Sequence, residues 1–488
     1  YDMGVIANAQ LVIKEDMELT DVQMEILVGC LNFVALGGSL LAGALCDYLG
    51  RRRAIAAVLL VLFAGAVAMA FSPGYVLLLL GRVVTGIGVG AGLVIVPIYV
   101  AEVSPPQWRG CLVTVIEVMI NAGILLGYVV GWGLHTRFPH WSGSWRLMLG
   151  LGGLPPAVIA AALRWVPESP RWLIANGLEA KAAPILQEVH GSPEAVEDAV
   201  TEIRRALELE EECSQRSPVW WLDRGWYALL RPSPAVVRML AAAGGVAVVQ
   251  AAIGSSAIVY YSPQILSAAG FATKAQQMGG TVAMGATKTA SVGIGLALFD
   301  RAGRRRMLLI STGACSVCLL LLAASLMQLE ADSHSSTGGK PEGAFSWLPL
   351  LCLCSYMVFF SIGLGPGVSV VASEVFPLLI RSRGLSLCAA ANRLVSGTVA
   401  MTFLSLARLL TVQGGFALYT ALGCLGFLHI YATLPETKGM SLEAIWGQFA
   451  AAGHSDGCHL HGDGHGHNYE GGEEEAAALV PRHQHPVH

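Results

Sequence analysis

Charged residues are scarce in this chain. Asp, Glu, Lys and Arg make up 13% of its 488 residues, whereas hydrophobic residues make up 54%. A soluble domain usually carries about 25% charged residues, because its surface must face water. The composition therefore predicts an all-α, integral, multi-pass membrane protein that lies in the lipid bilayer and has no nucleic-acid partner.

The sequence also lacks the residue clusters that catalysis or metal binding needs. No span or loop combines a nucleophile with a base, so the protein is predicted to be neither an enzyme nor a cofactor-binding protein. Cys315 and Cys318 have the spacing of a metal or redox motif, but they lie in an apolar run without a convergent histidine or carboxylate. We predict that they are packing residues.

Apolar runs of about twenty residues, the length that crosses a bilayer, follow one another along the chain. The first, Tyr1–Val12, is about half that length, and we expect it to be a first helix without its N-terminal half. With this stub, the runs predict twelve transmembrane helices in two six-helix halves, residues 1–166 and 235–434. Complete spans are predicted near 22–46, 54–72, 75–99, 111–134, 145–166, 235–262, 278–299, 307–328, 347–372, 386–410 and 415–434.

Two polar segments lie outside the predicted halves. Residues 167–234 alternate charged and apolar residues, which predicts a helical linker domain with two or three amphipathic helices. Residues 435–488 are rich in His, Gly and Glu and are predicted to be a disordered tail. Imidazoles in this tail could bind Zn, Ni or Cu weakly, or their metal affinity is incidental: His459, His461, His465 and His467.

Basic residues gather in alternate loops and set the expected orientation. Arg51–Arg53 and Arg304–Arg306 each lie between two apolar runs, where three consecutive arginines cannot enter hydrocarbon. The positive-inside rule places these loops, the linker and the tail in the cytoplasm. We expect a monomer in the plasma membrane.

Charged motifs recur in the same order in both halves. Asp47-Tyr-Leu-Gly-Arg-Arg-Arg matches Asp300-Arg-Ala-Gly-Arg-Arg-Arg, and two further pairs of motifs follow these at the ends of later spans. The order indicates internal duplication, and six-helix repeats that rock against each other are typical of transporters. We predict a loop network that controls this motion, made of Asp47, Arg51, Arg52, Glu102, Arg109, Glu168, Arg171, Asp300, Arg304, Arg305, Glu374, Arg381 and Glu436.

The motifs resemble those of a known family. The Arg-x-Gly-Arg-Arg loops, Pro167-Glu-Ser-Pro-Arg171, Pro435-Glu-Thr-Lys-Gly439 and the Gly81–Gly90 stretch are similar to the sugar porter branch of the major facilitator superfamily. Stretches such as Ala391-Asn-Arg-Leu-Val-Ser-Gly397 resemble the plant polyol and monosaccharide transporters within that branch. The resemblance implies a major facilitator fold and proton-coupled transport.

Asp2, Arg82, Glu117 and Lys288 are ionisable residues within predicted spans, where a charge is costly. The resemblance implies that Asp2 and Arg82 form the proton-responsive pair, and a static buried ion pair is the alternative. Glu117 and Lys288 are predicted either to contact substrate or to form a structural ion pair between the halves. The resemblance places them where many hexose porters use Gln and Asn.

Neutral polar residues complete the predicted substrate site. Amide and hydroxyl groups suit a small polyhydroxylated ligand, and the predicted contacts are Gln250, Ser256, Tyr260, Phe360 and Asn392. Compared with the hexose porters that the chain resembles, Ala251 and Ser256 replace Gln and Asn, and Ser369 replaces a Trp. Loss of that Trp removes a wall on which a sugar ring stacks, which favours an acyclic polyol or inositol.

These observations predict a secondary active transporter that moves a polyol or monosaccharide together with a proton by alternating access. A facilitative uniporter, with Asp2 and Arg82 purely structural, is one alternative. A sugar-sensing receptor built on a transporter scaffold is another, and a metal transporter would rest on the tail alone.

Overall fold

All the regular elements of the described part of the chain are helices. The computed structural model describes residues 1–105, 109–191, 193, 196–201, 203–205, 229, 232–335, 347–376, 378–438, 445, 448 and 449. The predicted histidine sites at His459, His461, His465 and His467 lie outside these residues, as does much of the predicted linker.

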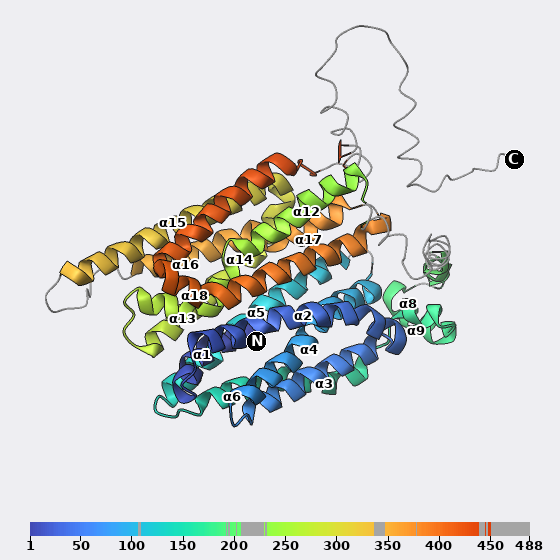
Figure 1. Cartoon of the computed structure of the whole chain (residues 1–488). Coiled ribbons are helices and arrows are strands. Elements are labelled where there is room, and N and C mark those ends of the chain that lie inside the picture. The colour runs from blue at the N-terminus through green and yellow to red at the C-terminus, as the bar shows by residue number, and fades with distance from the viewer. Residues whose placement is uncertain are drawn as a thin grey trace, which may run out of the picture.

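The helices form two groups that lie side by side, with two short helices between them in sequence (Figure 1). The N-terminal group consists of α1 (Asp2–Asp16), α2 (Asp21–Leu49), α3 (Arg51–Ala70), α4 (Tyr75–Val103), α5 (Arg109–Arg137), α6 (Ser144–Gly150), η1 (Leu151–Gly153), α7 (Leu154–Ala162) and η2 (Leu163–Trp165). The short helices are α8 (Pro170–Ala175) and α9 (Glu179–His190). The C-terminal group consists of α12 (Pro234–Ala252), α13 (Ser255–Ala268), α14 (Lys274–Ala302), α15 (Arg304–Ser335), α16 (Trp347–Phe359), η4 (Phe360–Leu364), α17 (Gly365–Val375) and α18 (Leu378–Thr433).

Within the described residues, nine helical segments are long and apolar enough to cross a membrane. Large apolar side chains are also exposed along them, for example Leu40, Leu60 and Leu80. Exposed apolar surface of this extent fits a protein whose solvent is lipid.

Four predicted spans differ in detail from the observed helices. The span predicted near 235–262 is interrupted at Ile253–Gly254, because Gly254 has a φ of 84° and starts a new helix. The span near 347–372 contains the π-helix η4. The spans near 386–410 and 415–434 are joined into α18, because a change of direction at Thr411 (φ 67°) takes the place of a loop.

The two groups begin and end corresponding helices in the same way. Helices α2 and α14 are each 29 residues long, and each starts with a capping box, Thr20–Gln23 in one and Thr273–Gln276 in the other. In a capping box the threonine side chain satisfies a free backbone N–H at the start of the helix. Each helix ends at a glycine that directly precedes three arginines.

The groups meet along three pairs of helices. Helix α2 packs against α18, α5 against α14, and α1 against α13. One cluster of buried apolar side chains, which includes Leu27, Tyr261 and Phe403, extends through both groups. Polar residues within this contact are therefore shielded from lipid.

Candidate functional site

Asp2 and Arg82 are brought together inside the N-terminal group. Arg82 Nη1 donates to Asp2 Oδ2 at 2.5 Å. The arginine is fully buried, and its other nitrogens donate to two carbonyls of α2, Leu27 O at 3.1 Å and Val28 O at 3.4 Å. The Asp2 side chain is 19% exposed. The carboxylate is thus the accessible partner of a guanidinium that the backbone holds in place.

Tyr260 of α13 connects this pair to the C-terminal group. Its electrostatic neighbours include Arg82, Asp2 and Arg393. Its carbonyl accepts from Gln10 Nε2 of α1 at 2.5 Å. The Tyr260 hydroxyl and Asn32 Nδ2 are buried and lie close to each other, and apart from each other neither has a hydrogen-bond partner among the described residues. These two groups remain available to a ligand.

Glu117 and Lys288 face each other across the contact between α5 and α14. Their charges interact, but the two described side chains form no direct ion pair. Arg393 of α18 is a third charged group in the same place, because it also interacts electrostatically with Glu117. Close by, Thr289 Oγ1 donates to Asn121 O at 3.2 Å and joins α14 to α5. Charged groups from three helices therefore converge where the groups meet.

Three of the residues predicted to contact substrate instead contact other residues of the C-terminal group. Gln250 Nε2 donates to Leu364 O at 2.6 Å and to Gly365 O at 2.9 Å. Asn392 Nδ2 donates to Gln250 Oε1 at 2.8 Å. The ring of Phe360 stacks on Tyr356, with 6.0 Å between centroids. Ser256 is half-buried in the first turn of α13.

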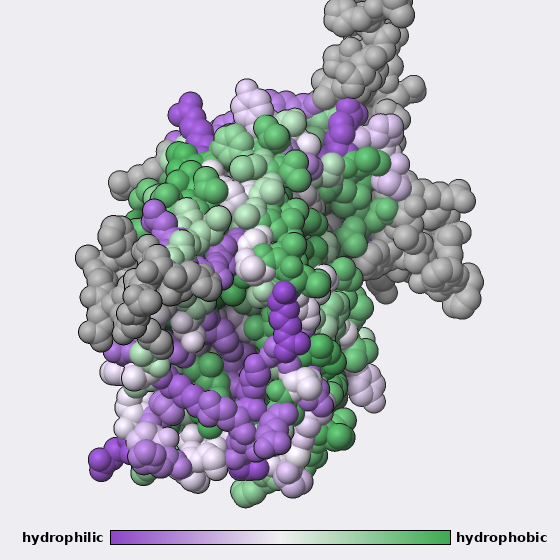
Figure 2. Space-filling model, turned by 60° about the vertical axis from the view of Figure 1, so that its left-hand side comes forward, coloured by the Kyte–Doolittle hydropathy of each residue, from purple (hydrophilic) through white to green (hydrophobic). Residues whose placement is uncertain are grey.

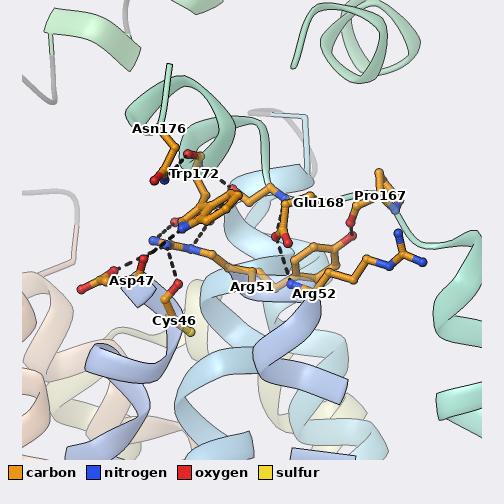
Figure 3. A network of polar contacts seen from close by, with 11 residues as sticks. Cys46, Asp47, Arg51, Arg52, Pro167, Glu168, Trp172 and Asn176 are labelled. Carbon is orange, nitrogen blue, oxygen red and sulfur yellow. Dashed lines mark hydrogen bonds and ion pairs between the residues drawn. The ribbon is translucent and has the colours of Figure 1, made fainter. Parts of the chain in front are cut away.

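The first arginine cluster lies at one end of the N-terminal group, which we call the arginine end (Figure 3). Arg51 donates to both oxygens of Glu102, from Nε at 2.9 Å and from Nη2 at 3.0 Å. Ser169, the N-cap of α8, donates to the same carboxylate at 2.5 Å. Glu168 accepts from the Arg52 backbone N at 2.9 Å. These bonds join the start of α3, the end of α4 and the start of α8.

The second cluster repeats this arrangement in the C-terminal group. Arg304 Nε donates to Glu374 Oε1 at 2.9 Å, and Thr437 Oγ1 donates to Glu374 Oε2 at 2.6 Å. Glu436 Oε1 accepts from the Arg304 backbone N at 2.9 Å. Arg305 donates to Tyr431 O at 2.7 Å. Thr437 and Glu436 thus correspond to Ser169 and Glu168.

Both clusters require a glycine before the first arginine. Gly50 and Gly303 have φ values of 84° and 94°. A Cβ at Gly50 would lie 2.7 Å from Glu168 Oε2, and one at Gly303 would lie 2.9 Å from Glu436 Oε2. A side chain at either position would therefore meet both backbone strain and the carboxylate that binds the arginine N–H.

Further residues of the predicted loop network lie near the same two clusters. Asp47 is exposed and lies 3.5 Å from Arg51 Nη1. Arg52 donates to Leu163 O at 3.1 Å. Arg381 donates to Phe376 O at 3.1 Å, and Arg171 lies in the first turn of α8. The side chains of Arg109 and Asp300 lie outside the described set.

The opposite end of the bundle carries polar contacts between the two groups. Glu25 of α2 is buried and accepts from Ser405 of α18, from the backbone N at 2.7 Å and from Oγ at 2.6 Å. Arg408 pairs with Asp21, and Lys274 pairs with Glu15. Figure 2 shows hydrophilic side chains gathered over the lower part of this face.

Sequence reasoning missed three of these polar residues. Arg393 and Glu25 are ionisable residues within apolar runs, so their cost in hydrocarbon was a usable signal. Asn32 lies in another such run, but a single amide in a helix has no distinguishing pattern. Its importance appears only when Tyr260 is placed beside it.

The family is shown by comparison with known proteins. The family model described as "Sugar (and other) transporter" matches residues 1–449. The chain belongs to the sugar transporter family. It is 39% identical over 445 residues to Probable polyol transporter 4 of Arabidopsis thaliana, covering 91% of this chain and 81% of that protein. It is 38% identical over 457 residues to polyol transporter 5 of the same plant, covering 91% and 82%.

Solved structures of a sugar porter share the fold of this family member. The inward-open conformation of the Escherichia coli xylose transporter XylE superposes with a TM-score of 0.74 at 22% identity, covering 92% of this chain and 96% of that one. A structure of the proton:xylose symporter XylE bound to 6-bromo-6-deoxy-D-glucose gives a TM-score of 0.70 at 23% identity, with coverage of 91% and 95%. The family and the fold thus make the chain an integral, multi-pass sugar-family transporter that has the fold of the XylE structures, not an enzyme.

Proposed function

We propose that this protein is a proton-coupled symporter of a polyol or a monosaccharide that works by alternating access. The observation that carries the proposal is the Asp2–Arg82 pair, a partly exposed carboxylate bound to a fully buried guanidinium. The names of the relatives, polyol transporters and a proton:xylose symporter, support the same substrate class and the same coupling.

The helices can be assigned to twelve spans in two six-helix halves, residues 1–166 and 235–434. The nine candidate segments become ten when α18 is divided at Thr411, and α1 and α14 bring the number to twelve. In this proposal, residues 167–234 form a cytoplasmic linker domain and residues 435–488 form a cytoplasmic tail. The arginine end faces the cytoplasm, because Lys and Arg of short loops are retained on that side.

Asp2 is the proposed proton acceptor. Protonation removes its negative charge and weakens the bond to Arg82 Nη1, while Leu27 O and Val28 O continue to hold the guanidinium. Arg82 is then a buried cation without its counter-ion, which is unfavourable in a low-dielectric environment. Loading of the proton therefore raises the free energy of this arrangement and favours a different packing of the two halves.

The substrate is proposed to bind where the halves meet, close to Tyr260, Glu117 and Lys288. Tyr260 interacts electrostatically with both Asp2 and Arg393, so a ligand that contacts the tyrosine also changes the surroundings of the proton site. Gln250 and Asn392 position their helices through their mutual bond, which uses Asn392 Nδ2 and leaves Asn392 Oδ1 to accept from a substrate hydroxyl. Contacts at the opposite end close the outer side in this conformation.

The test is uptake in voltage-clamped cells or proteoliposomes, with sorbitol, mannitol, myo-inositol and xylose as probes. The wild-type protein should carry inward current with its substrate, since a potential contributes about 2.3 kcal/mol per charge per 100 mV. Asp2→Asn should abolish accumulation against a gradient but retain substrate exchange. Wild-type uptake that ignores both pH and voltage would instead support a uniporter. Binding of a probe without any flux would support a sensing receptor.

A further inference from the structure

Arg393 is a cation without a partner at the contact between the two groups. It lies ten residues into the segment of α18 that starts at Arg383, which corresponds to about 15 Å along a helix. It is half-buried, and it makes no hydrogen bond or ion pair with any residue that the structure describes. A guanidinium in this position is costly unless it finds acceptors or water.

Arg393 has electrostatic neighbours on two other helices. It interacts electrostatically with Tyr260 of α13 and with Glu117 of α5. Lys288 of α14 also acts on Glu117 and is likewise without a direct partner among the described residues. The region thus presents two cations, one carboxylate and the hydroxyl of Tyr260, which lies beside Asn32. It holds more hydrogen-bond donors than protein acceptors.

The helix that carries Arg393 is held firmly beside it. The adjacent Asn392 donates to Ala247 O at 2.9 Å and to Gln250 Oε1 at 2.8 Å, which ties α18 to α12. Gln250 in turn donates to the carbonyls of Leu364 and Gly365. These bonds fix the rotation of α18 around Asn392, so the guanidinium is presented from a rigid support.

We propose that Arg393 is a substrate-binding residue whose guanidinium donates paired hydrogen bonds to two neighbouring oxygens of a polyol or sugar. The proposal rests on the proposed function and adds to it a residue that selects for vicinal hydroxyl groups. A planar guanidinium offers five donors in a fixed geometry that matches paired oxygen acceptors. Tyr260 contacts the same ligand from α13, and Glu117 accepts from a ligand hydroxyl on the other side.

The test compares equilibrium binding to purified wild type, Arg393→Gln, Arg393→Lys and Arg137→Gln. The probe is whichever of sorbitol, mannitol, myo-inositol and xylose the wild type binds, measured by calorimetry. Hydrogen bonds to a charged group predict that Arg393→Gln raises Kd by about tenfold to a hundredfold. Arg393→Lys should fall between, because lysine is a single point charge. Arg137→Gln, an exposed arginine in the last turn of α5, is the control and should stay within about twofold.

A series of monodeoxy analogues of the same probe identifies the contact itself. Removing a hydroxyl that Arg393 binds should weaken wild-type binding but leave binding to Arg393→Gln nearly unchanged, because interacting groups are not additive. Equal penalties at every position in both proteins would overturn the proposal. Wild-type affinity in a folded Arg393→Gln variant would also overturn it. If that variant does not fold, undiminished affinity in Arg393→Lys would do the same. A wild type that binds none of the four probes would instead contradict the proposed function.

Discussion

The two ends of this bundle use charge differently. At the arginine end, the ion pairs between described side chains join elements of the same group, Arg51 with Glu102 and Arg304 with Glu374. The opposite end also has a pair within one group, Arg146 with Asp16, but there charged residues additionally join helices of different groups, as Glu25 does with Ser405 and Lys274 with Glu15. Both ends therefore brace the groups internally, and only the opposite end adds described contacts that hold the groups together.

This difference has a consequence for the transport cycle. A pair within one group can remain intact while the groups tilt, whereas a pair between groups must break for the opposite end to open. Mutations at the two ends should therefore have different effects. Arginine-end variants should alter the stability of each group, and variants at the opposite end should alter the conformational equilibrium.

The largest effect is expected at the glycines of the arginine end. Gly50→Val and Gly303→Val each force a β-branched residue to a positive φ and into a glutamate, which should cost at least about 2 kcal/mol. Both variants should show a lower melting temperature and less monodisperse protein on size-exclusion chromatography. Gly43→Ala in α2, where a Cβ meets nothing within 4 Å, is the control. Wild-type behaviour of both valine variants would contradict the duplicated geometry.

The second-largest effect is expected when the arginines themselves are replaced. Arg51→Ala and Arg304→Ala each remove charge-assisted hydrogen bonds, a loss of about 1.5 to 3 kcal/mol. Transport in proteoliposomes should slow about tenfold, while equilibrium substrate binding should stay unchanged, because neither residue lies near Tyr260. A double-mutant cycle of Arg51→Ala with Glu102→Ala should show coupling between the two. Loss of substrate binding in correctly inserted protein would place these residues in the substrate site.

Glu25→Gln tests a contact between the two groups at the opposite end. The buried carboxylate accepts two bonds from Ser405, and an amide has one acceptor oxygen for both. The population of the state open at this end should rise about five- to thirtyfold, equivalent to about 1 to 2 kcal/mol. Distances between nitroxide labels at positions 22 and 409, in a cysteine-depleted variant, report the change. Arg51→Ala in the same background should leave those distances unchanged, and an equal shift in both variants would remove the distinction between the ends.

The smallest effect is expected for Lys274→Gln. Its partner Glu15 is 69% exposed at the side chain, so their ion pair should contribute less than about 1 kcal/mol. The shift in label distance should have the same sign as that of Glu25→Gln and should disappear at high salt, because exposed pairs are screened. A salt-independent effect would show that Lys274 acts through a different contact.

Much of the fold could be predicted from local patterns. Span α4 was expected near 75–99 and is observed at Tyr75–Val103, and span α3 was expected near 54–72 and is observed at Arg51–Ala70. The length of the apolar run and the position of the arginines are sufficient to predict these two helices. The break at Ile253–Gly254 and the π-helix at Phe360–Leu364 were missed, because they depend on contacts such as Ser311 Oγ with Leu364 N.

The candidate site was predictable in part. Asp2, Arg82, Glu117 and Lys288 stand out because an ionisable group in a span is expensive. Their partners could not be predicted. Glu117 and Lys288 are not directly paired, and the electrostatic interaction of Arg393 with Glu117 depends on how the two groups pack against each other.

The sequence by itself determined that this protein spans a membrane, that its motifs are duplicated and which loops carry the arginines. These properties follow from the cost of placing each local segment in hydrocarbon, whatever its neighbours are. The tertiary structure alone decided which glutamate binds which arginine, that Glu25 reaches Ser405, and that Arg393 faces Tyr260 without a partner. Those contacts join residues far apart in the chain, so they depend on the packing of whole helices, which no local pattern encodes.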